Sequence, residues 1–177
     1  WMFPLLVMAA LGFLGSSLLT GLVRRYALRS GILDVPNARS MHSQITPRGG
    51  GLAIAVVFFL SLMVLWALNV VSIRQAVALL GGGFAVALVG WLDDKRGLSP
   101  KIRAFAHLVA GLWAVAWLGG FSNLETGFGR LPLGVPGHAL ATVGIAWMTN
   151  LYNFMDGIDG LAAGEAVAVS GAASVLL

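Results

Sequence analysis

Two neighbouring acidic residues stand at the end of a long apolar run in this sequence. Asp93 and Asp94 directly follow Gly90-Trp91-Leu92. A pair of carboxylates at a membrane face is costly unless it binds something positive. A hard cation such as Mg²⁺ takes oxygen ligands, and it usually keeps waters and substrate phosphates as well. The pair is therefore a candidate metal or phosphate-handling site. The alternative is that it balances Lys95 and Arg96 in a solvated turn.

A second polar cluster lies near the end of the chain, in the stretch NLYNFMDGIDG. Asn153, Asp156 and Asp159 are spaced three apart, so on a helical backbone they would share a broad face. Gly157 and Gly160 instead favour a loop in which backbone groups can approach a ligand. The alternative is a polar helix end in which an aspartate caps the following helix.

Basic residues that could hold an anion occur in two further segments. Arg48 precedes Gly49-Gly50-Gly51, and Lys101 and Arg103 follow Pro100. Arginine holds phosphate through charge-assisted hydrogen bonds, and glycines that open a helix can present free N–H groups to an anion. No Walker lysine follows the glycines, so this is not a P-loop. The alternative is that these basic residues only anchor the chain at the membrane surface.

The amino-acid composition indicates the class of protein that holds these candidate residues. The chain has 177 residues, of which 58% are hydrophobic and only 10% are charged, whereas soluble domains average about 25% charged. This composition excludes an ordinary water-soluble domain and makes nucleic acid an improbable partner despite the net charge of +4. The absence of cysteine excludes disulfides and thiolate metal sites.

Stretches without charged residues define the expected helices, because a bilayer core requires about 20 apolar helical residues. They predict an all-α, polytopic membrane protein that forms a single integral membrane domain over residues 1–177. The chain ends within an apolar stretch, so we expect it to be the N-terminal part of a longer protein. Six transmembrane helices are predicted at about 3–23, 50–69, 75–92, 103–120, 137–152 and 161–177, with cytoplasmic loops at about 24–49, 93–102 and 153–160.

The distribution of basic residues predicts the orientation. Residues 24–48 and 93–103 hold nine of the 11 Lys and Arg residues, and two predicted crossings separate them. They should therefore lie on one side, which the positive-inside rule makes cytoplasmic, with the N-terminus outside. The turn at 152–160 falls on the same side. We therefore expect the acidic residues of both clusters to meet at one membrane face.

Three blocks in this order, RSMHSQITPRGGGLAI, GWLDDKRGLSPKIR and NLYNFMDGIDGLAAG, resemble the polyprenyl-phosphate N-acetylhexosamine-1-phosphate transferases of glycosyltransferase family 4. The branch that initiates O-antigen or common-antigen synthesis is the most similar. The resemblance implies a multi-pass enzyme of the bacterial inner membrane that uses Mg²⁺ or Mn²⁺. Such an enzyme moves a sugar-1-phosphate from a UDP-N-acetylhexosamine to polyprenyl (undecaprenyl) phosphate and releases UMP.

The resemblance also implies roles for individual residues. Asp93 and Asp94 match the family's paired aspartates, which are implicated in catalysis and in handling the metal and the lipid phosphate. The remaining assignments are Asp94 and Asp156 as metal ligands and Thr46, Arg48, Lys101, Asn153 and Asp159 as substrate-binding residues. Family members carry further metal-site and sugar-phosphate residues beyond the stretch present here, so we expect this chain alone to have an incomplete metal shell.

Other readings of the sequence stay open. The chain could belong to the peptidoglycan-type phospho-N-acetylmuramoyl-pentapeptide transferases, or it could be a transporter, a channel or a non-catalytic scaffold. Against a transporter, the acidic residues crowd one face, whereas ionisable residues along a transport path would lie within the spans. The sequence identifies neither the sugar nor whether the protein forms a homodimer.

Overall fold

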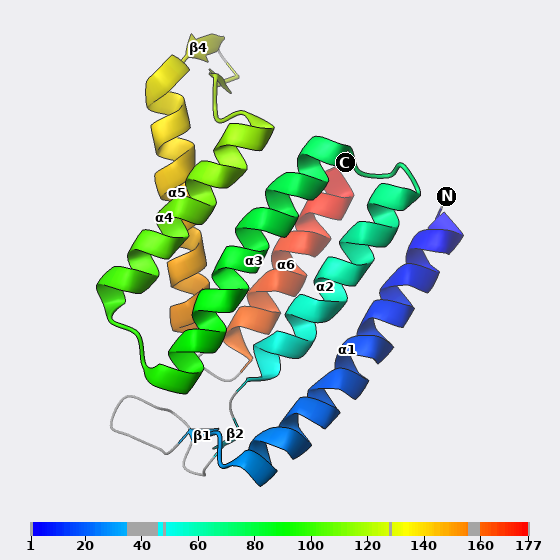
Figure 1. Ribbon diagram of the computed structural model, residues 1–177. Helices are drawn as coiled ribbons and strands as arrows, with labels where there is room; N and C mark the ends of the chain where they lie inside the picture. Colours follow the sequence, from blue (N-terminus) through cyan, green and yellow to red (C-terminus); the bar gives the residue numbers. More distant parts are fainter. Residues whose placement is uncertain (1, 35–45, 48, 128, 156–159, 177) are drawn as a thin grey trace.

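The computed structural model describes residues 2–34, 46–47, 49–127, 129–155 and 160–176, and its described part is a bundle of helices (Figure 1). Two short antiparallel ribbons join helix ends. One ribbon pairs β1 (Leu33–Asp34) with β2 (Thr46–Pro47), and the other pairs β3 (Asn123–Glu125) with β4 (Arg130–Pro132). The helices are α1 (Met2–Ser30), α2 (Gly50–Ala67), α3 (Ile73–Arg96), α4 (Pro100–Leu118), α5 (Gly134–Met155) and α6 (Leu161–Leu176).

The all-α, polytopic membrane architecture predicted from the sequence is confirmed, with a helix at each of the six predicted positions. Residues Val7–Ser30 of α1 and the whole of α2, α3 and α4 are long and apolar enough to cross a membrane. Within α6, Leu161–Ser174 is apolar but shorter. Helix α5 is not among the described helices that are both long enough and apolar enough to cross a membrane.

The helices extend beyond the predicted transmembrane spans at several ends. Helix α1 continues through the arginines to Ser30, α3 continues to Arg96, and α5 continues to Met155. A charged residue ends an apolar run, but it does not end a helix, because a helix can project beyond the bilayer core. What stops α3 is Gly97, whose left-handed φ of 64° suits glycine. On the opposite side, the stretch between the predicted helices 103–120 and 137–152 contains the β3–β4 ribbon, and α5 already begins at Gly134.

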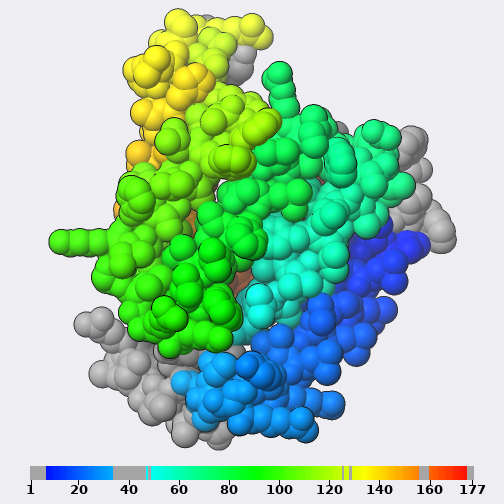
Figure 2. Space-filling view, viewed as in Figure 1, coloured from blue at the N-terminus to red at the C-terminus, as the bar shows by residue number. Residues whose placement is uncertain are grey.

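Consecutive helices pack against each other in chain order from α1 to α5, whereas α6 makes few contacts among the described residues, and its main described neighbour is α5. Figure 2 shows α1, α2, α3 and α4 side by side across one face of the molecule. The buried positions are mostly small residues, among them Ala53, Ala76, Ala110 and Gly111. Large apolar side chains instead cover the outside, as expected where lipid rather than water surrounds the bundle.

Because neighbouring helices are antiparallel, their polar ends coincide. Val23 of α1 approaches Gly49 just before α2, and Phe59 of α2 faces Gly83 of α3. Gly111 of α4 packs on the backbone of Thr142 in α5. One end of the bundle therefore collects the last turns of α1, α3 and α5 and the first turns of α2, α4 and α6 (Figure 1). We call this the polar end.

Candidate active site

The α3–α4 junction forms the centre of the polar end. After Gly97 the chain makes a short turn, and α4 starts at Pro100, a favourable first helical residue. Ser99 caps α4, because its hydroxyl accepts a hydrogen bond of 3.4 Å from the Ile102 N–H. The stop at Gly97 and the cap at Ser99 make this connection tight, so side chains on both sides of it are held close together.

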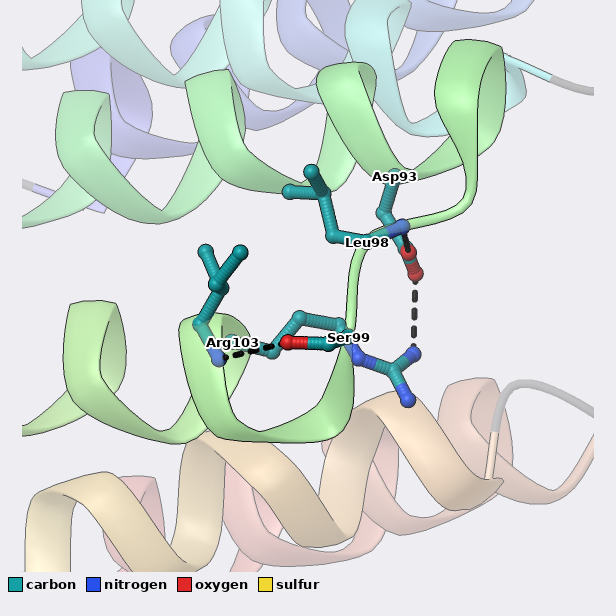
Figure 3. Close-up of polar contacts among 5 residues, drawn as sticks. Asp93, Leu98, Ser99 and Arg103 are labelled. Carbon is teal, nitrogen blue, oxygen red and sulfur yellow. Dashed lines mark hydrogen bonds and ion pairs between the residues drawn. The ribbon is translucent and has the colours of Figure 1, made fainter.

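Asp93 ties the two helices together across this turn (Figure 3). Its Oδ1 accepts a hydrogen bond of 2.6 Å from the Leu98 N–H. Its Oδ2 accepts one of 2.8 Å from Arg103 Nη1, which is also an ion pair. Its carbonyl accepts a further bond of 2.8 Å from the Gly97 N–H. Asp93 is therefore engaged through its backbone and through both carboxylate oxygens.

Asp94, the second member of the pair, has an exposed side chain and lines a cavity of about 450 Å³. The cavity lies between the end of α3 and the residues that follow α1, and its other lining residues are Gly31, Ile32, Leu33, Lys95 and Arg96. Two cationic side chains therefore share this cavity with one carboxylate. The Lys95 ammonium also stands 4.1 Å from the centre of the Trp91 ring, a cation–π contact within the last turn of α3.

Lys101 and Asn153 lie at the same level along the bundle. Both side chains are exposed, Lys101 in the first turn of α4 and Asn153 in the last turn of α5. The contact between Gly111 and Thr142 sets the register of these antiparallel helices. The same number of residues separates Gly111 from Lys101 as separates Thr142 from Tyr152, the neighbour of Asn153. The structure therefore brings the first part of the second polar cluster, at Asn153, to the level of the α3–α4 junction.

The other predicted site residues are described less fully. Thr46 belongs to β2, where it pairs with Asp34 of β1, and β2 contacts α1. The backbone at Thr46 is thus joined to the end of α1. Arg48, Asp156 and Asp159 lie outside the described residues.

The histidines do not form part of a described metal site. His138, near the start of α5, accepts a hydrogen bond of 2.9 Å at Nδ1 from the Gly120 N–H, which engages this nitrogen at the end of the bundle opposite the polar end. His107 is buried within α4, and its Nδ1 has no hydrogen-bond partner among the described residues. Within the same part of the chain, no three His, Cys, Asp or Glu residues are grouped closely enough to hold a metal ion.

The family to which this chain belongs follows from its sequence. Residues 76–177, more than half of the 177 residues, match the model of the family described as "Glycosyl transferase family 4". The chain belongs to glycosyl transferase family 4. The matched region includes Asp93, Asp94, Lys101 and Asn153, so the candidate site lies within the part that carries the family's pattern.

Two relatives of this family 4 chain are named as undecaprenyl-phosphate N-acetylglucosaminyl 1-phosphate transferases. The "Probable undecaprenyl-phosphate N-acetylglucosaminyl 1-phosphate transferase" of Bacillus subtilis (strain 168) is 32% identical over 157 residues, covering 85% of this chain and 42% of the relative. The "Undecaprenyl-phosphate alpha-N-acetylglucosaminyl 1-phosphate transferase" of Yersinia pestis is 32% identical over 169 residues, covering 93% of this chain and 45% of the relative.

A third relative is named for a different transferred group. The "Phospho-N-acetylmuramoyl-pentapeptide-transferase" of Acaryochloris marina (strain MBIC 11017) is 32% identical over 193 residues, covering 97% of this chain and 49% of the relative. The chain thus spans less than half the length of each of these three relatives.

Two features of the site were not predicted from the sequence. Arg103 was considered only as an anchor at the membrane surface or a phosphate contact, whereas it pairs with Asp93. The backbone at Gly31, Ile32 and Leu33 was not considered at all, yet it forms one wall of the cavity beside Asp94. The helix stop at Gly97 and the cap at Ser99 indicate a short turn that brings Arg103 near the end of α3, but the pairing with Asp93 also depends on the direction of both side chains.

Proposed function

We propose that the intact protein containing this chain transfers a sugar-1-phosphate of the N-acetylhexosamine type from a UDP-sugar to polyprenyl phosphate. UMP is released, and the lipid-linked sugar starts O-antigen or another cell-envelope glycan. The reaction takes place at the cytoplasmic face of the bacterial inner membrane, on the side of the polar end. The observation that carries this proposal is a cationic polar end, containing an aspartate pair, in a chain of glycosyl transferase family 4.

The charge at the polar end suits two phosphate-bearing substrates. The described basic residues there outnumber Asp93 and Asp94, so anionic groups are attracted to this end of the bundle. A net positive membrane face also favours the cytoplasmic orientation. The basic side chains described at this end are Arg24, Arg25, Arg29, Lys95, Arg96, Lys101 and Arg103.

The transfer needs little acid–base help. A phosphate monoester has a second pKa of about 6, so the lipid phosphate is already largely dianionic near neutral pH. One of its oxygens attacks the sugar-bearing phosphorus of the UDP-sugar, and the bond from that phosphorus to the bridging oxygen breaks. UMP leaves with the electron pair. Positioning and charge stabilisation dominate such reactions, so the task of Lys101, at the start of α4, is to hold phosphate.

A divalent metal would suit the oxygen donors at this site. The carboxylate of Asp94 is a ligand type that Mg²⁺ or Mn²⁺ accepts. We propose that Asp94 holds the ion together with Asp156, which lies outside the described residues. When bound, the ion would neutralise charge on the phosphates. Asn153 and Asp159 are proposed to contact the nucleotide sugar, and Thr46 and Arg48 the substrate from the other side.

A transfer assay tests the proposed function. The purified intact protein in lipid nanodiscs receives radiolabelled UDP-sugars and polyprenyl phosphate, with and without Mg²⁺. We expect the label to move to the lipid with one UMP released per sugar, and chelation to stop the transfer. Asp94→Asn should lower kcat on the order of 100-fold, the scale of losing one preorganised charged group. Arg74→Gln, at the opposite end of the bundle, is the control and should leave the rate unchanged. Ion or solute flux without UMP release would refute the proposal.

A second candidate is the peptidoglycan-type reaction, with UDP-N-acetylmuramoyl-pentapeptide as the donor. The identity of 32% to the Acaryochloris marina relative, over 97% of this chain, favours keeping it. Both candidates use the same acceptor and the same transfer chemistry, so the donor separates them. Label transfer from the pentapeptide donor, with none from UDP-N-acetylhexosamines, would select the second candidate.

A further inference from the structure

Asp93 occupies an electrostatically poor position. It lies in the last turn of α3, where the partial negative charge of the helix end disfavours a carboxylate. The structure compensates for this with the Leu98 N–H at 2.6 Å on one oxygen and Arg103 Nη1 at 2.8 Å on the other. An acidic residue that needs two such partners is bound into the turn, because releasing it would leave a carboxylate facing the carbonyl groups at the helix end.

The Arg103 side chain is also held in the ion pair with Asp93. Its side chain is only 30% exposed, and that of Asp93 is 22% exposed. Its Nε is buried and has no hydrogen-bond partner among the described residues. A guanidinium that served only as an anchor at the membrane surface would extend toward water and lipid headgroups. This one instead turns back across the junction to α3 (Figure 3).

The paired residues stand next to the two exposed candidate site residues. Asp94 follows Asp93 directly on α3, and Lys101 precedes Arg103 by two positions on α4. Only the turn at 97–99 separates the two helices along the chain. The ion pair therefore sets how far apart the exposed carboxylate and the exposed ammonium lie, and at what angle. Packing along α3 and α4 holds the two helices together over their length, so the ion pair fixes the arrangement of the residues next to the turn.

We propose that Asp93 and Arg103 form a positioning clamp that holds Asp94 and Lys101 in the arrangement needed for sugar-phosphate transfer. Arg103 is thus a positioning residue for the reaction, and it acts through Asp93. The carboxylate of Asp93 serves the turn rather than taking a proton from the lipid phosphate. This inference rests on the proposed function, because the arrangement matters only if transfer takes place at the polar end.

The test is a double-mutant cycle on the intact protein in nanodiscs. The variants are Asp93→Asn, Arg103→Gln, Arg103→Lys and the doubles that combine each Arg103 change with Asp93→Asn. Asp93→Asn keeps an oxygen that can accept the Leu98 N–H but loses the charge opposite Arg103. Arg74→Gln removes an arginine at the far end of the bundle and is the matched control. For each variant, kcat and the KM of both substrates are measured per folded molecule.

The clamp predicts a specific pattern in these constants. Arg103→Gln should lower kcat on the order of 100-fold, the scale of a misplaced reacting group. Arg103→Lys, which keeps a charge-assisted hydrogen bond, should recover most of that loss. Asp93→Asn should behave like Arg103→Gln, and the double variant should be no slower than the slower single variant, because one clamp cannot be broken twice. A purely structural defect would instead lower the yield of folded protein and leave kcat per folded molecule intact.

Other outcomes overturn the clamp. Parent-like kcat in Arg103→Gln would overturn it, and so would losses that multiply in the double variant, which would mark Asp93 as acting on substrate independently. If Arg103→Gln does not fold, Arg103→Lys in the Asp93→Asn background decides, because the clamp predicts no further loss there and any further loss contradicts it. An inactive parent protein would instead overturn the proposed function, and the clamp's catalytic role with it.

Discussion

A tight contact between α4 and α5 at Gly111 gives a quantitative test of how these helices pack. A methyl group built at Gly111 would lie 2.7 Å from the carbonyl oxygen of Thr142 and 3.5 Å from Cβ of Ile145. A carbon normally stays about 3.3 Å or more from a carbonyl oxygen. Gly111→Ala must therefore push the two helices apart by about 0.6 Å or distort the backbone of Thr142.

Two effects of Gly111→Ala oppose each other. Overpacking a tight contact costs about 1–3 kcal/mol, whereas replacing glycine by alanine inside a helix gains about 1 kcal/mol in propensity. Gly144→Ala in α5 isolates the steric cost, because a methyl group there would meet nothing within 4 Å. The same propensity gain applies to both variants. The expected difference is therefore about 1–3 kcal/mol, with Gly144→Ala the more stable.

The assay is equilibrium unfolding of the intact protein in mixed micelles by titration with a denaturing detergent, followed by far-ultraviolet circular dichroism. The same shift of α4 against α5 should lower the transfer rate, because this contact sets the register between Lys101 and Asn153. If the Gly111 and Gly144 variants unfold within about 0.5 kcal/mol of each other, the ordinary scatter for surface changes, the packing described here is wrong.

Three further changes probe individual contacts, each measured by the same unfolding assay. Ser72→Ala removes the hydroxyl that accepts the Gln75 N–H at 3.3 Å and should cost about 1 kcal/mol; an unchanged unfolding midpoint would show that this cap contributes nothing. Trp113→Phe removes the indole N–H that donates to the Val77 carbonyl at 3.0 Å and should cost about 0.5–1.5 kcal/mol, and more if the carbonyl is left unpaired; a more stable variant would argue against this link between α3 and α4. His107→Leu replaces a buried ring whose Nδ1 has no partner in the described chain, so stability should hold or rise; a clear loss would mean that the ring has a partner elsewhere in the intact protein.

The sequence predicted the helices well because the bilayer imposes a simple rule on them. A run without charged residues has to be helical in lipid, since its backbone groups can find no other partners. The same rule misplaced the helix ends, because it detects where the apolar run stops rather than where hydrogen bonding stops. Arg24–Ser30 remain helical beyond the last uncharged stretch of α1. The end of α3 is set by the left-handed Gly97 and not by Asp93.

The position of several candidate site residues along the bundle was predicted from the sequence, but their contacts were not. The distribution of Lys and Arg, together with the number of predicted crossings, placed Asp93, Lys101 and Asn153 on one side of the membrane, and the structure has them at one end of the bundle. It could not show that Asp93 accepts hydrogen bonds from Leu98 and Arg103, because such pairing depends on the angle at which α4 leaves the turn. The lengths of the apolar runs and the positions of the charged residues predict at which end of a helix a residue lies. A hydrogen bond also depends on the direction of each side chain, which these patterns do not predict.

The central claim is that polar segments distant in sequence meet at one face of the membrane. This chain has no cysteine, so single cysteines placed in it can report the membrane face directly once any cysteine elsewhere in the intact protein is replaced. Arg96→Cys and Phe154→Cys probe the polar end, and Val70→Cys and Leu124→Cys probe the opposite end. A membrane-impermeant maleimide should label the first two only in inverted vesicles and the last two in intact cells. Labelling of positions 96 and 154 from opposite faces would contradict the account.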